Sequence, residues 1–386
     1  MRMGRVRVFA AVFLISLAAA GLAWADPATD AYNEGNRLFD AGQVRESIAY
    51  YDRAIRLNPG DADVYNNRGI AYAQLDQPQR ALQDYTEAIR LNPSHANAYF
   101  NRGLAHRKLG QNDRAIQDYT EASRINPHDA EAYIARGSAY VALRQLQRAL
   151  QDYTEAIRLN PHHAMAYYNR CTVNLQLSQP SRALEECHEA LRLNPKNVDA
   201  YYNRGVAYRK LGQHDRGIQD FTEAIRLNPQ DAEFYYSRGQ AHHDLGQFER
   251  ALHDYEQVLR LDPNFTKVLF DRAKTLMQLK QFDRAIEGFT GAIRVNPRDD
   301  EAYRFRGVTR TLKGDPSGAI ADLDKAIEIN PKNAQAYGDR GIARLLLWKD
   351  VDAQRDFAKC YELDSTLRQS FASLIEKAKA KRAGKL

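Results

Sequence analysis

Four stretches of the chain place an Asn-Arg pair between an aromatic residue and a small one. They read YNNRG from Tyr65, YFNRG from Tyr99, YYNRC from Tyr167 and YYNRG from Tyr201. An asparagine amide offers one acceptor and two donors, which matches a peptide group of an extended ligand. An arginine guanidinium binds a carboxylate through two parallel hydrogen bonds. Both are chemistries of recognition and packing.

Patterns typical of catalysis are not found in the sequence. The ten histidines have no metal-binding spacing. His162 and His163 follow a proline, and His242 replaces the tyrosine of the Tyr72 column, which favours a core role. There is no glycine-rich phosphate loop and no nucleophile elbow. We therefore expect no enzyme activity, no catalytic residue, no metal and no cofactor.

A 34-residue internal period organises most of the chain. Asn-Pro begins at 58, 92, 126, 160, 194, 228, 296 and 330, and Asp262-Pro263 fills the gap. One further step reaches Asp364-Ser365, where LDS echoes LNP. Ten units thus run from about Ala28 to Ser365.

Each unit has the hydrophobic pattern of two helices of about a dozen residues. In the second unit a break at Asp76-Gln77-Pro78 separates two helically spaced sets, Tyr65, Gly69 and Tyr72, then Ala81, Tyr85 and Ala88. Glycine after the first helix in other units predicts a left-handed cap at Gly110, Gly212 and Gly246. Pro78 and Pro180 suit the first turn of the second helix.

These columns of aromatic, glycine, alanine and proline residues resemble the tetratricopeptide repeat (TPR) family over nearly the whole chain after residue 25. The resemblance implies an all-α fold, a superhelical solenoid of tandem 34-residue helix-turn-helix repeats with a C-terminal capping helix. We expect a signal peptide at 1–25, ten repeats at 28–365, and a capping helix with a basic tail at 366–386. The cap has the apolar stripe Leu367, Phe371, Leu374 and Ile375, and its basic side favours a solvated face.

The arginine of the pair lies on the packed side of the first helix, and an acid stands at position i+16 from it. The arginines are 68, 102, 136, 170, 204, 238, 306 and 340. The first unit has Glu34 and Tyr50 at these two positions, and the Arg272 unit has Gly288 in place of the acid. We expect each arginine to bridge the two helices of its unit, fixing their register more than adding stability.

The asparagine lies on the opposite side and forms a ladder, Asn33, Asn67, Asn101, Asn169 and Asn203. Helices pack about 8–10 Å apart and an extended chain rises about 3.3 Å per residue, so one amide meets roughly every third ligand residue. This resembles the asparagine ladder in the TPR superhelix of O-linked N-acetylglucosamine transferase, whose catalytic domain is not found here. The alternative is that these amides stay hydrated.

Beside the ladder we expect a partly exposed hydrophobic rail. Its members are Phe100, Ile134, Tyr168, Tyr202, Tyr236 and Phe270. Shielding by neighbouring repeats is the alternative. The basic pairs Arg107-Lys108 and Arg209-Lys210 are candidate contacts for acidic groups of a ligand, or else solvated helix ends. The carboxylate clamp of chaperone-binding TPR proteins is unsupported, since Tyr32, Asn97 and Asn101 stand where its basic residues belong.

Two cysteines replace core residues of a single repeat. Cys171 stands in the glycine column and Cys187 in the Tyr/Phe column, and these columns meet between the two helices. In an oxidising compartment the pair is a disulfide candidate, and two buried thiols are the alternative. Cys360 stands in a small-residue column of the last repeat, and we expect it to be unpaired and buried.

The start of the chain, at 1–25, has the order of a secretory signal. Arg2, Arg5 and Arg7 precede an apolar run at 8–23, and Ala23-Trp24-Ala25 offers a cleavage site. An uncleaved membrane anchor is the alternative. Cleavage lowers the net charge from +6 to +3, since the segment holds three arginines and no acid. We expect an exported protein, periplasmic first and otherwise secreted or signal-anchored, without stable membrane insertion after cleavage and without nucleic acid.

The sequence as a whole predicts an exported scaffold or adaptor that binds a protein or an extended peptide in the concave TPR groove. One alternative is a structural subunit that oligomerises through its convex face or its ends. Another is an accessory subunit that regulates a polysaccharide or assembly machine of the cell envelope. The structural subunit would keep its partner when Asn67, Asn101 and Tyr202 are replaced, whereas the accessory subunit differs from the scaffold only in its partner, which the sequence does not name.

Overall fold

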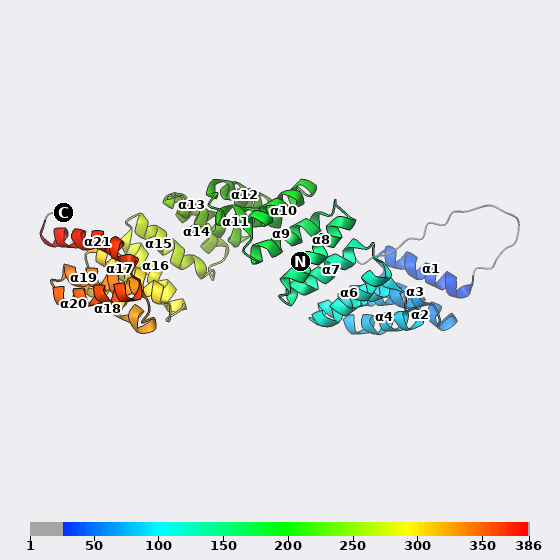
Figure 1. The fold of residues 1–386 in the computed structure, drawn as a ribbon. Helices are drawn as coiled ribbons and strands as arrows, with labels where there is room; N and C mark the ends of the chain where they lie inside the picture. Colours follow the sequence, from blue (N-terminus) through cyan, green and yellow to red (C-terminus); the bar gives the residue numbers. More distant parts are fainter. Residues whose placement is uncertain (1–25, 385–386) are drawn as a thin grey trace. The chain divides into compact units, whose positions relative to one another are not determined.

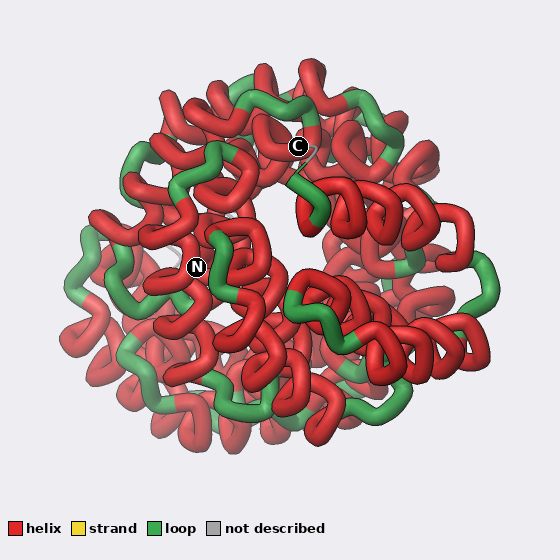
Figure 2. The backbone as a smooth tube through the Cα atoms, turned by 90° about the vertical axis from the view of Figure 1, so that its left-hand side faces the viewer, coloured by secondary structure: helices red, strands yellow, loops and turns green. Residues whose placement is uncertain are grey.

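A computed structural model describes residues 26–384, which form 21 α-helices and no strand (Figures 1 and 2). The expected signal segment, residues 1–25, lies outside the described residues. Among residues 26–384, no helix combines the length and the apolar character needed to cross a bilayer. The chain divides into two compact units, residues 1–200 and 201–386, which are described separately.

The first unit contains five antiparallel helix pairs. They are α1 (Pro27–Asp40) with α2 (Val44–Leu57), α3 (Ala62–Gln74) with α4 (Pro78–Leu91), α5 (Ala96–Lys108) with α6 (Asn112–Ile125), α7 (Ala130–Ala142) with α8 (Leu146–Leu159), and α9 (Ala164–Gln176) with α10 (Pro180–Leu193). The second helix of each pair also packs on the first helix of the next pair, so the pairs stack.

The second unit repeats this arrangement, and the chain enters it in the first turn of α11 (Val198–Lys210). The later helices are α12 (His214–Leu227), α13 (Ala232–Asp244), α14 (Phe248–Leu261), α15 (Lys267–Gln278), α16 (Phe282–Val295), α17 (Asp300–Lys313), α18 (Pro316–Ile329), α19 (Ala334–Leu346), α20 (Asp350–Leu363) and α21 (Leu367–Arg382). The expected repeated pair of helices is confirmed throughout the described chain.

The helices end where local backbone chemistry forbids another turn. One or two residues after each first helix, a residue has a positive φ in all ten repeats, at 42, 76, 110, 144, 178, 212, 246, 280, 314 and 348, and five of these residues are glycine. This confirms the cap predicted at Gly110, Gly212 and Gly246. Each second helix ends before an Asn or Asp that leaves the α region. In the first nine repeats a proline follows this residue and disfavours the α region for it.

In seven of the ten repeats the core contains an aromatic ring pressed against a glycine of the partner helix. A Cβ added at Gly69 would lie 2.6 Å from the ring of Tyr85, and Gly103 faces Tyr119 in the same way. Tyr85 and Tyr119 are at most 2% exposed. Only a residue without a side chain allows the two helices to approach this closely, which explains the glycine column.

The predicted arginine bridge is confirmed in eight repeats. In the third, Nε and Nη2 of Arg102 donate to the two carboxylate oxygens of Asp118 at 3.0 and 2.7 Å. The carboxylates lie in the core and are nearly inaccessible, as for Asp152 at 6%. The pairs are 68–84, 102–118, 136–152, 170–186, 204–220, 238–254, 306–322 and 340–356.

The arginine has two further contacts that the sequence analysis missed. Nη1 of Arg136 donates 3.2 Å to Thr120 on the second helix of the preceding repeat, and the guanidinium lies 5.4 Å from the ring centroid of Tyr133. Arg68 uses Asp52 in the same way, at 2.6 Å. One side chain thus joins three helices, and we name this arrangement the arginine fork.

The eighth repeat shows what happens without the acid. Arg272 has Gly288 where the other repeats have a carboxylate, and its closest acid is Glu256 at 4.0 Å. Its buried Nε has no hydrogen-bond partner. Burial and the nearby charge of Arg284 lower the pKa of Arg272 below its usual value.

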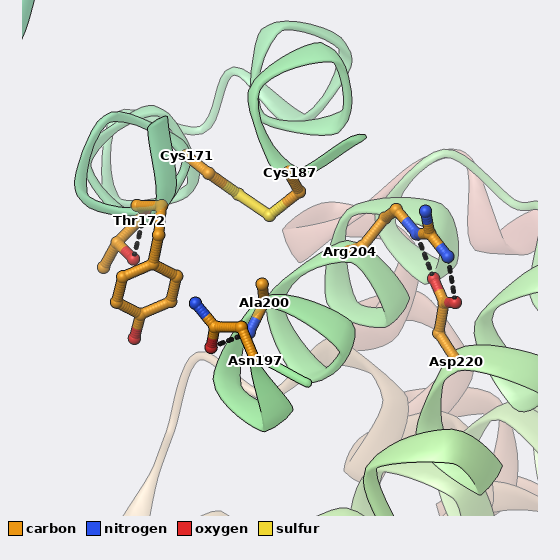
Figure 3. The surroundings of a disulfide bond; sticks show 8 residues. Cys171, Thr172, Cys187, Asn197, Ala200, Arg204 and Asp220 are labelled. Carbon is orange, nitrogen blue, oxygen red and sulfur yellow. Dashed lines mark hydrogen bonds and ion pairs between the residues drawn. A yellow bond between two sulfur atoms is a disulfide. The ribbon is translucent and has the colours of Figure 1, made fainter. Parts of the chain in front are cut away.

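The disulfide candidate of the fifth repeat is joined in the structure. Cys171 on α9 and Cys187 on α10 are bonded, with their Cα atoms 5.5 Å apart (Figure 3). Both cysteines are fully buried, and they occupy the places of the glycine and the ring. Cys360 is free and buried, as expected.

The fork of the fifth repeat is weakened. Its acid is Glu186, and the buried Nε of Arg170 and Oε2 of Glu186 have no hydrogen-bond partner, although the two side chains form an ion pair of 2.7 Å. Figure 3 shows the intact form at Arg204 and Asp220, which are joined by two hydrogen bonds. The disulfide therefore supplies in this repeat the coupling that the fork and the ring supply elsewhere.

The C-terminal helix α21 packs mainly on α19. Phe371 is buried and lies directly over Gly338. Leu374, a member of the apolar stripe, is 43% exposed. Phe371 stands one full repeat after Tyr337, so α21 has the register of a first helix, and no second helix follows in the described residues to cover Leu374.

The fork predicts unequal effects for two arginines of one repeat. Arg136→Ala leaves the buried carboxylate of Asp152 without its partner, and we expect the free energy of unfolding to fall by about 2–3 kcal/mol. Arg158 is the matched control, since it pairs with Glu155 on the exposed surface. Arg158→Ala is expected to cost at most about 0.5 kcal/mol. Urea unfolding followed by circular dichroism measures both, and equal losses would contradict the fork's structural role.

The disulfide predicts that stability depends on redox conditions, and that a variant without the two cysteines loses this dependence. Reduction of the wild-type protein removes a cross-link across a separation of 16 residues, and we expect a loss of about 3 kcal/mol. Cys171→Gly combined with Cys187→Tyr rebuilds the glycine and ring of the other repeats, so its urea midpoint is expected to be the same with and without reductant. A wild-type midpoint that is unchanged after reduction, with free thiols verified by alkylation, would refute the prediction.

Candidate functional site

The candidate site consists of two neighbouring columns on the first helices, the ladder and the rail. The structure links them by a rule that the sequence analysis missed, because a rail residue contacts the ladder residue of the next repeat, at position i+35. Such pairs are Tyr32 with Asn67, Asn66 with Asn101, Tyr202 with Ser237, Tyr236 with Asp271, Phe270 with Phe305, and Arg304 with Asp339. We name these contacts the ladder pairs.

The first three repeats connect their ladder pairs into one polar network. Nδ2 of Asn67 donates to the hydroxyl of Tyr32 at 2.8 Å and to Oδ1 of Asn36 at 3.0 Å. Oδ1 of Asn67 accepts from Asn66, whose own Oδ1 accepts from Asn101 at 3.0 Å. The amides at the start of the ladder are thus hydrogen-bonded to one another between repeats.

The other ladder asparagines differ in what they offer a ligand. Asn101 is buried at 3% exposure, and its Nδ2 is used by Asn66, so its predicted role as a ligand contact does not fit its position. Asn33 is exposed. Asn169 is half-buried and makes no side-chain hydrogen bond within residues 26–384. Asn203, the last of the ladder, is half-buried.

The expected exposure of the rail is wrong for its first two members. Phe100 and Ile134 are 6% and 7% exposed. Phe100 packs on Tyr119 with ring centroids 5.7 Å apart, and Ala135 of the next repeat belongs to the same cluster. The rail is shielded here because each repeat covers the ring of the one before it. Tyr168, Tyr202 and Tyr236 are half-buried.

Tyr236 shows how the rail becomes polar in the second unit. Its hydroxyl donates 2.7 Å to Asp271 and accepts 2.9 Å from Gln240, which also donates to Asp271. Burial and the neighbouring carboxylate raise the pKa of Tyr236 well above its usual value. The phenol therefore stays protonated and acts as a fixed donor.

In each basic pair, one residue forms an ion pair and the other is exposed to solvent. Lys108 forms an ion pair with Asp76 at 2.5 Å, and Arg209 with Asp244 at 3.5 Å. Both contacts join neighbouring repeats. Arg107 and Lys210 are exposed and form no ion pair within the described residues. These two cations remain accessible to an acidic ligand.

A hollow on the fork side was not predicted. It has a volume of about 460 Å³ and is lined by Arg238, His242, Glu249, Arg250, His253 and Asp254. In other repeats an arginine at the position of Arg250 stacks on a tyrosine, as Arg148 does on Tyr140 at 5.7 Å. His242 is smaller than that tyrosine, so the space stays open. No sequence signal was specific for the hollow, because His106 replaces the same tyrosine in the third repeat.

The described residues contain no group of three or more His, Cys, Asp or Glu side chains placed to hold a metal ion. The side chains assembled at the ladder and the rail are amides, phenols, carboxylates and hydrocarbon rings. Their arrangement can hold repeats together and can present hydrogen-bond donors and apolar surface.

Comparison with known families follows the 34-residue period. A family model described as tetratricopeptide repeat matches residues 68–130, 134–198, 172–221 and 202–264. A TPR repeat model matches 35–76, and a further tetratricopeptide repeat model matches 242–307.

Solved structures are similar in fold at low sequence identity. PilF from Pseudomonas aeruginosa is 20% identical with a TM-score of 0.50, and the match covers 55% of this chain and 97% of PilF. YrrB, described as a TPR protein with an unusual peptide-binding site, is 24% identical with a TM-score of 0.44, covering 48% and 95%. A TPR protein from Parabacteroides merdae is 22% identical with a TM-score of 0.48, covering 64% and 98%.

The first family model alone accounts for half of the chain, and its matches fall on the same columns that carry the arginine forks and the glycine–ring contacts. The chain therefore belongs to the tetratricopeptide repeat family.

Proposed function

We propose that this TPR protein is an exported, non-catalytic scaffold that binds an extended segment of a partner protein along its first helices. TPR repeats form protein-interaction scaffolds in general, and the proposal adds the binding face and the location. The observation that carries it is the unused amide of Asn169 in a column where other polar side chains are paired between repeats.

The surroundings of Asn169 suit a peptide. Met165, one turn earlier on α9, is 50% exposed and offers an adaptable apolar contact. A half-buried amide with two donors and one acceptor can bind a peptide group beside it. Arg107, in the same unit, is free to attract acidic side chains of the partner. We place the centre of binding on α9.

Export is supported by two independent features. The segment 1–25 has the order of a secretory signal. The fifth repeat depends on a buried disulfide in place of its ring and glycine, and such bonds persist in oxidising compartments. The periplasm is the compartment that we propose.

Site-specific photo-crosslinking tests the binding face. A photo-reactive residue at Met165 or at Asn169 is expected to give the same partner adduct in the native compartment. Glu185 is the matched control, because it is exposed on the second helix of the same repeat. Adducts of equal yield from Glu185 would contradict the proposed face.

The role of the amide is tested on the captured partner. Asn169→Ala is expected to weaken binding about two- to tenfold, the effect of one hydrogen bond, and to leave the urea midpoint unchanged. Asn101→Ala is the comparison, since it leaves Asn66 without its donor and is expected to lower stability. Full binding by Asn169→Ala would remove the amide from the proposal.

Export is tested on the protein as its host makes it. We expect mass spectrometry of the purified chain to find Asp26 as its first residue, and fractionation to recover it outside the cytoplasm. Ala25→Leu, which removes the small residue before the cleavage site, is expected to retain residues 1–25. An intact N-terminus in the cytoplasmic fraction would overturn the location and leave the binding face untouched.

A further inference from the structure

The loop between α19 and α20 places a tryptophan where the backbone disfavours one. Trp348 has φ 62° and is 68% exposed. Five repeats have glycine at this position, and the others have Asp76, Arg144, Ser178 and Lys280. A large side chain in the left-handed region is strained. An exposed aromatic ring held in this conformation indicates use by a partner.

The ring is held in place from one side. The guanidinium of Arg382, in the last turn of α21, lies 4.0 Å from the centroid of Trp348. Nη1 of Arg382 also donates to the carbonyl of Leu345 at 3.3 Å and to Oδ1 of Asp350 at 2.8 Å. Figure 1 shows α21 beside α19 at this end of the second unit. Trp348 is therefore a fixed projection.

Exposed apolar and basic residues lie next to Trp348 and next to Arg382 in the sequence. Val351 is 68% exposed, as much as Trp348 itself. Lys349 and Lys381 are exposed and form no ion pair within the described residues. The charge of Asp350 is neutralised by Arg382. We name the surface formed by Trp348, Lys349, Val351 and Lys381 the tryptophan tip.

This composition distinguishes between classes of partner. Protein interfaces are enriched in tryptophan and arginine but depleted in lysine. Surfaces that rest on membranes combine tryptophan and aliphatic side chains with lysines, because the indole suits the headgroup layer and the lysines attract anionic lipids. The exposed lysines therefore favour a lipid surface.

We infer that the tryptophan tip docks reversibly on an anionic lipid surface, with Trp348 at headgroup level. Two apolar side chains and two lysines make a weak contact that depends on salt. The inference stands apart from the binding face proposed on α9, and it tethers the second unit to a membrane.

Vesicle binding tests the inference with the chain that starts at Asp26, which contains every described helix. Trp348 is then its single tryptophan and reports directly on its surroundings. With vesicles of phosphatidylcholine and phosphatidylglycerol we expect a blue shift of the emission and co-sedimentation. Pure phosphatidylcholine, or salt raised from about 50 mM to about 500 mM, is expected to lower binding about tenfold or more.

Variants distinguish vesicle binding by the tryptophan tip from nonspecific adsorption. Trp348→Gly installs the residue that five other repeats have, so we expect lost vesicle binding without a lower melting temperature. Lys349→Glu with Lys381→Glu is expected to abolish the preference for anionic vesicles. Leu312→Gln removes another exposed apolar side chain of the second unit and is expected to bind normally.

Two results would overturn the inference. One is the absence of vesicle binding at low salt, including the case in which Trp348 is crosslinked to a protein instead. The other is unchanged vesicle binding by Trp348→Gly.

Discussion

A guanidinium that reaches three helices is the contact on which the repeats depend. Its fork fixes the second helix of its own repeat through a buried carboxylate, and its remaining arm reaches the second helix of the repeat before. The planar shape of arginine makes this possible, since lysine has no two parallel donors to offer a carboxylate. Because the carboxylates are almost inaccessible, loss of the arginine would leave a buried charge. The contact therefore contributes stability as well as register, more than the sequence analysis assumed.

Repeats that lack the complete fork show which other contacts can couple their two helices. The eighth has an arginine without an acid, and its core retains the ring of Phe289. The fifth lost the ring, the glycine and the shorter acid together, and it has a covalent bond in their place. A repeat thus tolerates the loss of one coupling element, and the loss of several coincides with a cross-link.

The features predicted correctly from the sequence are those confined to one helix pair. The acid at i+16 from each arginine, the left-handed caps such as Gly110, and the pair of Cys171 and Cys187 all follow from the geometry of a single hairpin. The errors concern contacts between repeats. Phe100 was expected to be partly exposed, and its burial depends on how closely the next first helix covers it. Leu374 belongs to the apolar stripe of the cap, and its exposure depends on the absence of a following helix from the described residues.

The ladder pairs have a consequence for how such a chain can change. Arg304 matches Asp339, and Tyr236 matches Asp271, so each repeat carries the chemical complement of its neighbour. Units that look alike by their shared columns are therefore not interchangeable. A duplicated repeat would bring Arg304 against a second copy of Phe305, or Phe270 against a second copy of Asp271. The adjoining faces of the units therefore fix their order.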